Sequence, residues 1–169
     1  MHGTWDDTHT VIEKYQTNAH GAPGVHVATP LVTSNGAAVI VDRGWMQTTN
    51  DGTDRPKTPT PTSGLVTVTG WVRVNGTGDA AKVHSSQARA LSADTIARTL
   101  PYSAYRNVID LADQAPTDAA ALAPVEMPDA TGDGPHFFYG LQWWFFGVLA
   151  VFGFFYLMYD EWTRRKTQV

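Results

Sequence analysis

The sequence predicts an α+β membrane protein. A small antiparallel β-sheet or barrel-like extracytoplasmic domain with one short helix is expected to precede a C-terminal transmembrane helix. Two observations lead to this prediction. Residues 137–159 form an apolar run of 23 residues with one polar amide, Gln142, and no charge. The residues before this run are polar overall, and they contain short β-rich runs separated by stretches rich in Gly, Pro, Thr and Asp.

The polar part contains five segments with the composition of β-strands. They cover residues 8–15, 24–33, 37–45, 65–74 and 105–111. Ser34-Asn35-Gly36 joins two of them and predicts a hairpin. Residues 92–100 predict a short helix, with Ser92 as its N-cap and Asp94 in its first turn. The expected domain therefore spans residues 1–111, and residues 112–135 are expected to form a linker rich in Pro, Asp and Gly.

The apolar run has the length and the ends of a membrane span. At about 1.5 Å per residue it reaches roughly 35 Å, and a bilayer core is about 30 Å thick. Trp143 and Trp144 near one end, with Tyr159 and Trp162 at the other, are the interfacial aromatic residues that a spanning helix carries. Residues 136–160 are therefore predicted to cross the lipid bilayer.

Charge predicts the orientation of this span. Arg164, Arg165 and Lys166 follow it, whereas the flank before it, "EMPDATGDGPH", carries only acids and one histidine, His136. The positive-inside rule then places the tail, residues 161–169, in the cytoplasm and residues 1–135 outside the plasma membrane. Export of that domain needs a signal, but the sequence opens with "MHGTWDDTHTV". We therefore expect an upstream membrane helix that is missing here through truncation or a misassigned start.

Composition excludes several functions. The formal charge of −4 comes from scattered acids, so no nucleic-acid-binding surface is expected. The chain has no cysteine, which rules out a thiolate metal site, and Met46, Met127 and Met158 form no copper-binding cluster in the sequence. No nucleophile motif is present, so the protein is not expected to be an enzyme.

Two positions are candidates for binding. Arg43, in "VDRGW", either binds a propionate or a partner carboxylate or, as is commoner, forms a structural pair. His136 falls in the first turn of the predicted span and either ligates a metal or anchors the helix at the interface. Several residues share its helical face and leave room for a flat macrocycle. They are Tyr139, Gly140, Trp143, Gly147, Ala150 and Phe154.

Three segments in the right order resemble one family. "PHFFYGLQWW" resembles the His-x-x-Tyr-x-x-x-Trp opening of the second membrane helix in the Surfeit-locus-protein-one family of cytochrome c oxidase assembly factors. "PLVTSNGAAVIVDRGW" is similar to that family's first signature, which ends here in Arg43, Gly44 and Trp45. "VTVTGWVR" is similar to a later strand, and the C-terminal residues look most like those of actinobacterial members.

The resemblance implies a non-enzymatic factor, a chaperone of the respiratory chain, that assists insertion of haem a into aa3-type haem-copper oxidase or stabilises its catalytic subunit. The implied partners are oxidase subunit I, its neighbouring subunits and a respiratory supercomplex. His136 matches the residue implicated in haem binding, with Tyr139 and Trp143 as pocket walls. The sequence departs from the family in lacking the first membrane helix. A resident structural subunit without a cofactor remains the alternative.

Overall fold

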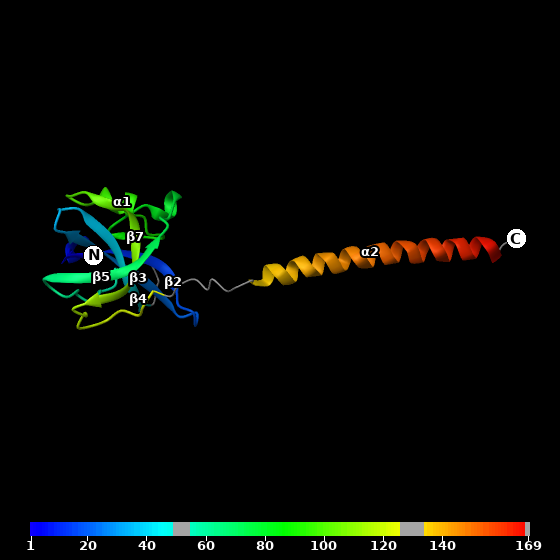
Figure 1. Ribbon diagram of the computed structural model, residues 1–169, viewed down its shortest axis with the longest axis horizontal. Helices are drawn as coiled ribbons and strands as arrows, with labels where there is room; N and C mark the ends of the chain where they lie inside the picture. The colour runs from blue at the N-terminus through cyan, green and yellow to red at the C-terminus, as the bar shows by residue number, and fades with distance from the viewer. Residues whose placement is uncertain (49–54, 126–133, 168–169) are drawn as a thin grey trace. The chain divides into compact units, whose positions relative to one another are not determined.

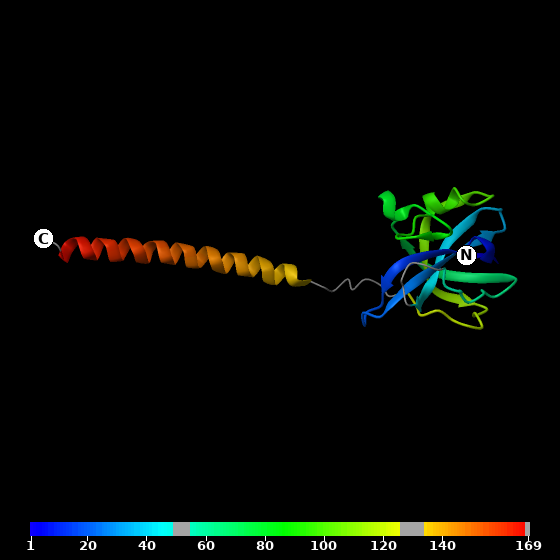
Figure 2. The ribbon, with the colours of Figure 1, turned by 180° about the vertical axis from the view of Figure 1, so that it is seen from behind.

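The computed structural model describes residues 1–48, 55–125 and 134–167, with side chains for all but 134–137 and 165–167. The chain divides into two compact units, Met1–Met127 and Pro128–Val169. The first unit contains every strand in the described residues, and the second contains the long helix α2 (Figures 1 and 2).

In its described residues, the first unit is a curled sheet with two short 3-10 helices and one α-helix. Its strands are β1 (His2–Trp5), β2 (Val11–Thr17), β3 (Pro23–Thr33), β4 (Ala38–Gln47), β5 (Leu65–Arg73), β6 (Gln87–Ala88) and β7 (Ala104–Ala115). The 3-10 helices are η1 (Asp7–His9) and η2 (Gly78–Ala81), and the α-helix is α1 (Ala93–Ala97).

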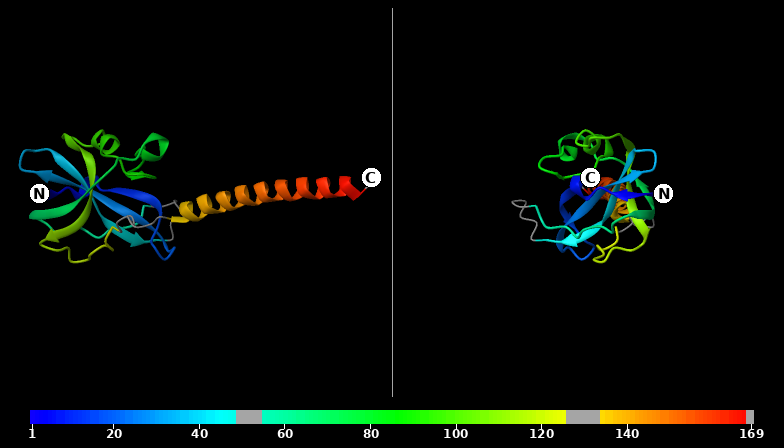
Figure 3. Two further views of the ribbon diagram at one scale, coloured as in Figure 1. Left: turned by 45° about the vertical axis from the view of Figure 1, so that its right-hand side comes forward. Right: turned by 90° about the vertical axis from the view of Figure 1, so that its left-hand side faces the viewer.

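The sheet closes into a five-stranded barrel because β1 pairs with two strands at once. The closed order is β1-β5-β7-β4-β3 and back to β1, while β2 and β6 continue the sheet beyond β3. Figure 3 shows the curled sheet from two further directions. Gly3 of β1 lies opposite both Thr33 and Val66. A Cβ atom at Gly3 would lie 2.5 Å from the Val32 carbonyl oxygen, so glycine permits this close approach. The predicted barrel-like domain is thus confirmed.

Two strand pairs differ from the antiparallel arrangement that the sequence predicts. β4 pairs with β7 in parallel, with Ile40 opposite Val108, and β2 pairs with β6 in parallel. The physical reason is a crossover. After β5 the chain passes through η2, β6 and α1 before it returns as β7, which lies between β5 and β4. The strands β1 and β6, which were not predicted, are too short to show an alternating pattern.

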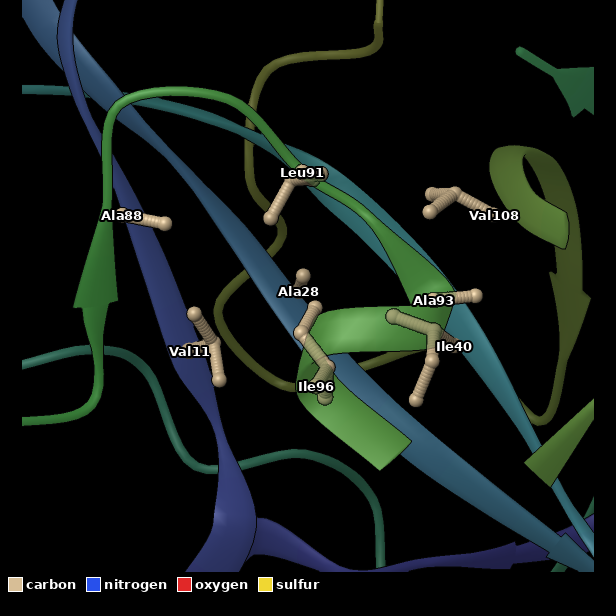
Figure 4. Packing of buried hydrophobic residues seen from close by; sticks show 8 residues of the cluster. All are labelled: Val11, Ala28, Ile40, Ala88, Leu91, Ala93, Ile96 and Val108. Atoms are coloured by element: carbon tan, nitrogen blue, oxygen red, sulfur yellow. The ribbon is translucent and has the colours of Figure 1, made fainter. Parts of the chain in front are cut away.

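The two faces of β4 build two cores, because successive side chains of a strand point to opposite sides. Val39 and Val41 face the barrel interior with residues from the other barrel strands, and Ile40 faces α1. The interior cluster consists of Leu31, Val39, Val41, Val66, Val68 and Ile109. The second cluster, shown in Figure 4, consists of Val11, Ala28, Ile40, Ala88, Leu91, Ala93, Ile96 and Val108.

The predicted hairpin and short helix are both present. Gly36 has φ +81°, and the Thr33 amide donates to the Ala37 carbonyl, which closes the turn between β3 and β4. Ser92 precedes α1 at the N-cap position, but its side chain accepts no capping hydrogen bond. The side chain of Asn75 instead accepts a hydrogen bond from the Ala93 amide at 3.0 Å.

The last strand runs further than residue 111, where the sequence places the end of the domain. β7 continues to Ala115 because it pairs with β5 as far as Thr67. Residues 112–115 therefore belong to the sheet and not to the predicted linker, and Ala123 also pairs with the barrel, at Trp45. Residues 126–133 of the predicted linker lie outside the described residues.

The second unit is α2 (Gly134–Thr167). Within the described part of the chain, it is the one helix long and apolar enough to cross a membrane, with a candidate span of Phe138–Arg164. Its large apolar side chains are exposed, including Phe138, Trp144 and Phe152. The helix extends beyond the predicted span of 136–160 at both ends, and at its C-terminal end Arg164 pairs with Asp160, one turn earlier, at 3.0 Å.

Candidate functional site

Arg43, the first residue of the family-like motif, lies inside the barrel. Its side chain lies on the same face of β4 as that of Val41, two residues earlier, and is fully buried. Its Nη2 atom donates to Asp118 Oδ2 at 2.6 Å, and Nη1 donates to the Pro59 carbonyl at 3.2 Å. The guanidinium also lies over the Trp5 ring, 5.7 Å from its centroid. Arg43 is therefore a structural pair, and its terminal nitrogens are already bonded within the domain.

Asp118 is the partner that sequence reasoning missed. Its carboxylate accepts hydrogen bonds from Arg43, from the Thr62 amide at 2.8 Å and from Gln114 Nε2 at 2.6 Å. Burial acts to raise the pKa of Asp118, but these hydrogen bonds and the charge of Arg43 outweigh it and hold the pKa below its ordinary value. Asp118 is 75 residues from Arg43 in the chain, so no local pattern pairs the two.

Gly44 and Trp45 bind the segment that follows β7. Gly44 has φ +135°, and a Cβ atom there would lie 2.3 Å from the Ala123 carbonyl oxygen. The Trp45 amide donates to that carbonyl at 2.8 Å, and the Ala123 amide donates to the Trp45 carbonyl at 2.9 Å. The motif Arg43-Gly44-Trp45 thus holds residues 118–123 against the end of β4, just before the chain leaves the domain.

The opposite face of β4 carries a buried charge cluster, which we define as Glu13, His26, Asp42, Arg73 and Asp110. Asp42 is fully buried, and its Oδ2 atom lies 2.9 Å from His26 Nδ1 and 2.9 Å from a terminal nitrogen of Arg73. Arg73 Nε lies 3.0 Å from Asp110 Oδ1, and its terminal nitrogen lies 3.7 Å from Glu13 Oε2. The cluster therefore has three carboxylates, one guanidinium and one imidazole.

Burial and pairing shift the protonation of this cluster in different directions. Burial raises the pKa of Glu13 and of Asp110, and the positive charge of Arg73 offsets only part of the effect. Burial also acts to lower the pKa of His26, but the hydrogen bond and charge of Asp42 outweigh it and raise that pKa. One signal in the sequence marks these positions. His26 and Asp42 interrupt the apolar runs "GVHVA" and "VIVDRG", where a polar residue needs a buried partner.

The candidate haem residues lie on α2. His136 is in the first turn of α2, and its side chain is outside what the structure describes. Tyr139 and Trp143 are 59% and 75% exposed, and a Cβ atom at Gly147 would meet no atom within 4 Å. The surface around Gly147 is concave and apolar, with Trp143 and Val151 among its lining residues. These features fit one wall of a site for a flat, apolar macrocycle, and the described residues of α2 themselves supply no second wall.

Comparison with known proteins gives one match. A family model described as the SURF1 family matches residues 1–148, which is most of the 169-residue chain. The matched range contains the motif at Arg43, the whole barrel and the start of α2 through Trp143. No curated protein and no solved structure matches the chain.

Proposed function

The chain belongs to the SURF1 family, whose members are cytochrome oxidase assembly factors, and from this premise we propose that it assists the insertion of haem a into the catalytic subunit of an aa3-type haem-copper oxidase or stabilises that subunit. The observation that supports this proposal most strongly is the extent of the family match. It reaches beyond the barrel into α2 and includes His136, Tyr139 and Trp143 together.

In this proposal α2 holds haem a at the outer side of the membrane. The His136 imidazole is the iron ligand, and Tyr139 and Trp143 are walls of the pocket. Haem iron would take a nitrogen lone pair of the His136 imidazole, so the imidazole would be neutral in that role. His136 is in the first turn of α2, beside the other proposed pocket residues in the sequence. Gly140 and Gly147 share the helical face of His136, and the open space beside both glycines also supports a haem on this face.

The second wall of the pocket would come from the oxidase. Exposed aromatic side chains along α2 suit contact with lipid or with another membrane helix. We propose that α2 lies against subunit I and that the barrel, on the extracytoplasmic side of the plasma membrane, docks on neighbouring oxidase subunits. Three basic residues near the C-terminus support a cytoplasmic tail.

Haem recovery with the purified chain tests the proposal. The full chain is extracted from membranes in mild detergent, and haem per chain is measured as the pyridine haemochrome. His136→Ala is expected to lower the haem content at least tenfold, because it removes the iron ligand. His84→Ala is the matched control, since His84 is an exposed histidine between η2 and β6, away from α2 in the sequence.

The same measurement also distinguishes this proposal from the alternative, a resident structural subunit without a cofactor. Equal haem in the wild-type and His136→Ala proteins refutes the ligand role. A resident structural subunit would instead purify without haem and co-migrate with mature oxidase in native electrophoresis.

A further inference from the structure

Three adjacent strands bring a possible set of metal ligands to one point. Glu13 of β2 lies directly opposite His26 of β3, and Asp42 of β4 follows across an irregularity between His26 and Ala28. One ligand atom of each residue lies within 4.8 Å of the others. All three side chains are mostly buried, with the carboxylates at most 9% exposed and the imidazole 15% exposed.

Backbone amides already orient one oxygen of each carboxylate. The Leu91 amide donates to Glu13 Oε1 at 3.1 Å, and the Gly44 amide donates to Asp42 Oδ1 at 3.0 Å. The second oxygens, Glu13 Oε2 and Asp42 Oδ2, remain for other partners. Such hydrogen bonds to the far side of a ligand are how proteins orient the groups that bind a metal.

The cluster has an unpaired acceptor that needs explanation. Glu13 Oε2 is buried and accepts no hydrogen bond from any residue that the structure describes. Arg73 lies 2.9 Å from Asp42 and 3.0 Å from Asp110 as an ion-pair partner, and its distance of 3.7 Å to Glu13 Oε2 is too long for a hydrogen bond. The cluster brings three carboxyl groups together with one guanidinium and one imidazole, so acidic groups outnumber basic groups in a largely buried site, where an unpaired charge is costly.

A divalent cation resolves this imbalance. With neutral His26, two carboxylates and one divalent ion balance in charge, and Arg73 remains paired with Asp110. We propose that Glu13, His26 and Asp42 bind a divalent first-row transition metal ion through Oε2, Nδ1 and Oδ2. Two carboxylates and one imidazole without a thiolate form the nitrogen and oxygen ligand set that Zn²⁺, Mn²⁺ and Fe²⁺ accept.

Arg73 is then the competitor of the ion. Its terminal nitrogen lies 2.9 Å from Asp42 Oδ2, next to the position that the ion would take. Its side chain is 30% exposed, so it can turn away while Nε stays near Asp110. A purely structural charge cluster would need Arg73 and bind no ion, whereas a metal site should bind its ion more tightly without Arg73.

Zinc titration of the untagged full chain in detergent, after treatment with a chelator, tests this proposal. Wild-type protein is expected to bind one equivalent of Zn²⁺ by equilibrium dialysis. Glu13→Gln and His26→Gln are each expected to weaken binding at least tenfold. Arg73→Gln is expected to strengthen it. His20→Gln changes an exposed histidine outside the cluster and should leave binding unchanged.

A spectroscopic measurement keeps the test decisive if a variant fails to fold. Wild-type protein loaded with one equivalent of Cu²⁺ should show one coordinated imidazole nitrogen in pulsed electron paramagnetic resonance. Absence of that nitrogen, absence of zinc binding, or equal binding by wild type and His26→Gln would overturn the proposal. None of these results depends on haem, so they are independent of the proposed function.

Discussion

At the scale of single residues, the ion pair of Arg43 and Asp118 makes the sharpest prediction. Asp118→Ala leaves the buried guanidinium without its carboxylate, so the free energy of unfolding should fall by about 3–5 kcal/mol at pH 7. Urea unfolding followed by tryptophan fluorescence measures this change. Asp79→Ala is the control, because Asp79 pairs with Lys82 on the surface and its loss should leave stability close to wild type.

The same pair predicts the pH dependence of stability. The pKa of Asp118 is lower in the folded state than its ordinary 3.8, so its stabilising effect is fully present above about pH 4 and is lost as the pH falls through the lowered folded pKa. The stability difference between wild type and Asp118→Ala should therefore shrink in acid. A difference that stays constant from pH 7 to pH 3 would contradict this account of the pair.

Gly44 makes a second prediction at this scale. Gly44→Ala should weaken the pairing of Trp45 with Ala123, because the new methyl group would lie 2.3 Å from a backbone oxygen and φ is +135°. Gly64→Ala is matched in having a positive φ, of +89°, but has no atom within 4 Å of the added carbon. Amide hydrogen exchange at Ala123 should become faster in Gly44→Ala than in Gly64→Ala, and equal exchange would contradict the steric argument.

Individual residues differ in how far the sequence predicts them. The turn at Asn35 and Gly36 is predictable because its conformation depends on neighbouring residues. The motif identifies Arg43 as a candidate. No local pattern identifies Asp118, because only the folding of the chain brings it next to Arg43. Glu13 shows no local signal at all, since its role depends on a strand neighbour and on the amide of Leu91.

At the scale of elements, the glycines of α2 test the proposed haem face. Gly147 lies about 20° from His136 around the helix, and Gly153 lies about 100° to the other side, at roughly 100° per residue. Gly147→Leu should fill the concave surface near Trp143 and lower haem recovery several-fold. Gly153→Leu adds the same bulk elsewhere and should have little effect. Equal loss in both variants would contradict a single haem face.

Elements were predictable where their pattern is long. β3, β4 and α2 were each located within a few residues, because strand composition and apolar length are local properties. The two parallel pairings were not predicted. They depend on how the segment with η2 and α1 returns across the sheet, and this crossover buries α1 against Ile40 and Val108.

At the scale of the whole molecule, membrane orientation can be tested with introduced cysteines, since the chain has none of its own. Ser34→Cys lies in an exposed turn of the barrel and should react with a membrane-impermeant maleimide in intact cells. A cysteine added after Val169 should react only after lysis. The reverse labelling pattern would contradict the orientation that the charge distribution predicts.

The family and the architecture could be predicted at this scale because several weak motifs occur in the right order along the chain. The family match over residues 1–148 confirms the family, and the closed barrel confirms the barrel-like domain. The proposed haem pocket could not be derived from this sequence alone. Its proposed residues lie on one exposed helix, and its second wall is proposed to come from a partner.

Haem a content of the oxidase catalytic subunit tests the central claim most directly. The subunit is isolated from membranes of cells that lack this protein and of the same cells complemented with wild type or with His136→Ala. We predict a low ratio of haem a to subunit without the protein, recovery with wild type, and little recovery with His136→Ala. A full haem a ratio in the absence of the protein would contradict the proposed role in haem insertion.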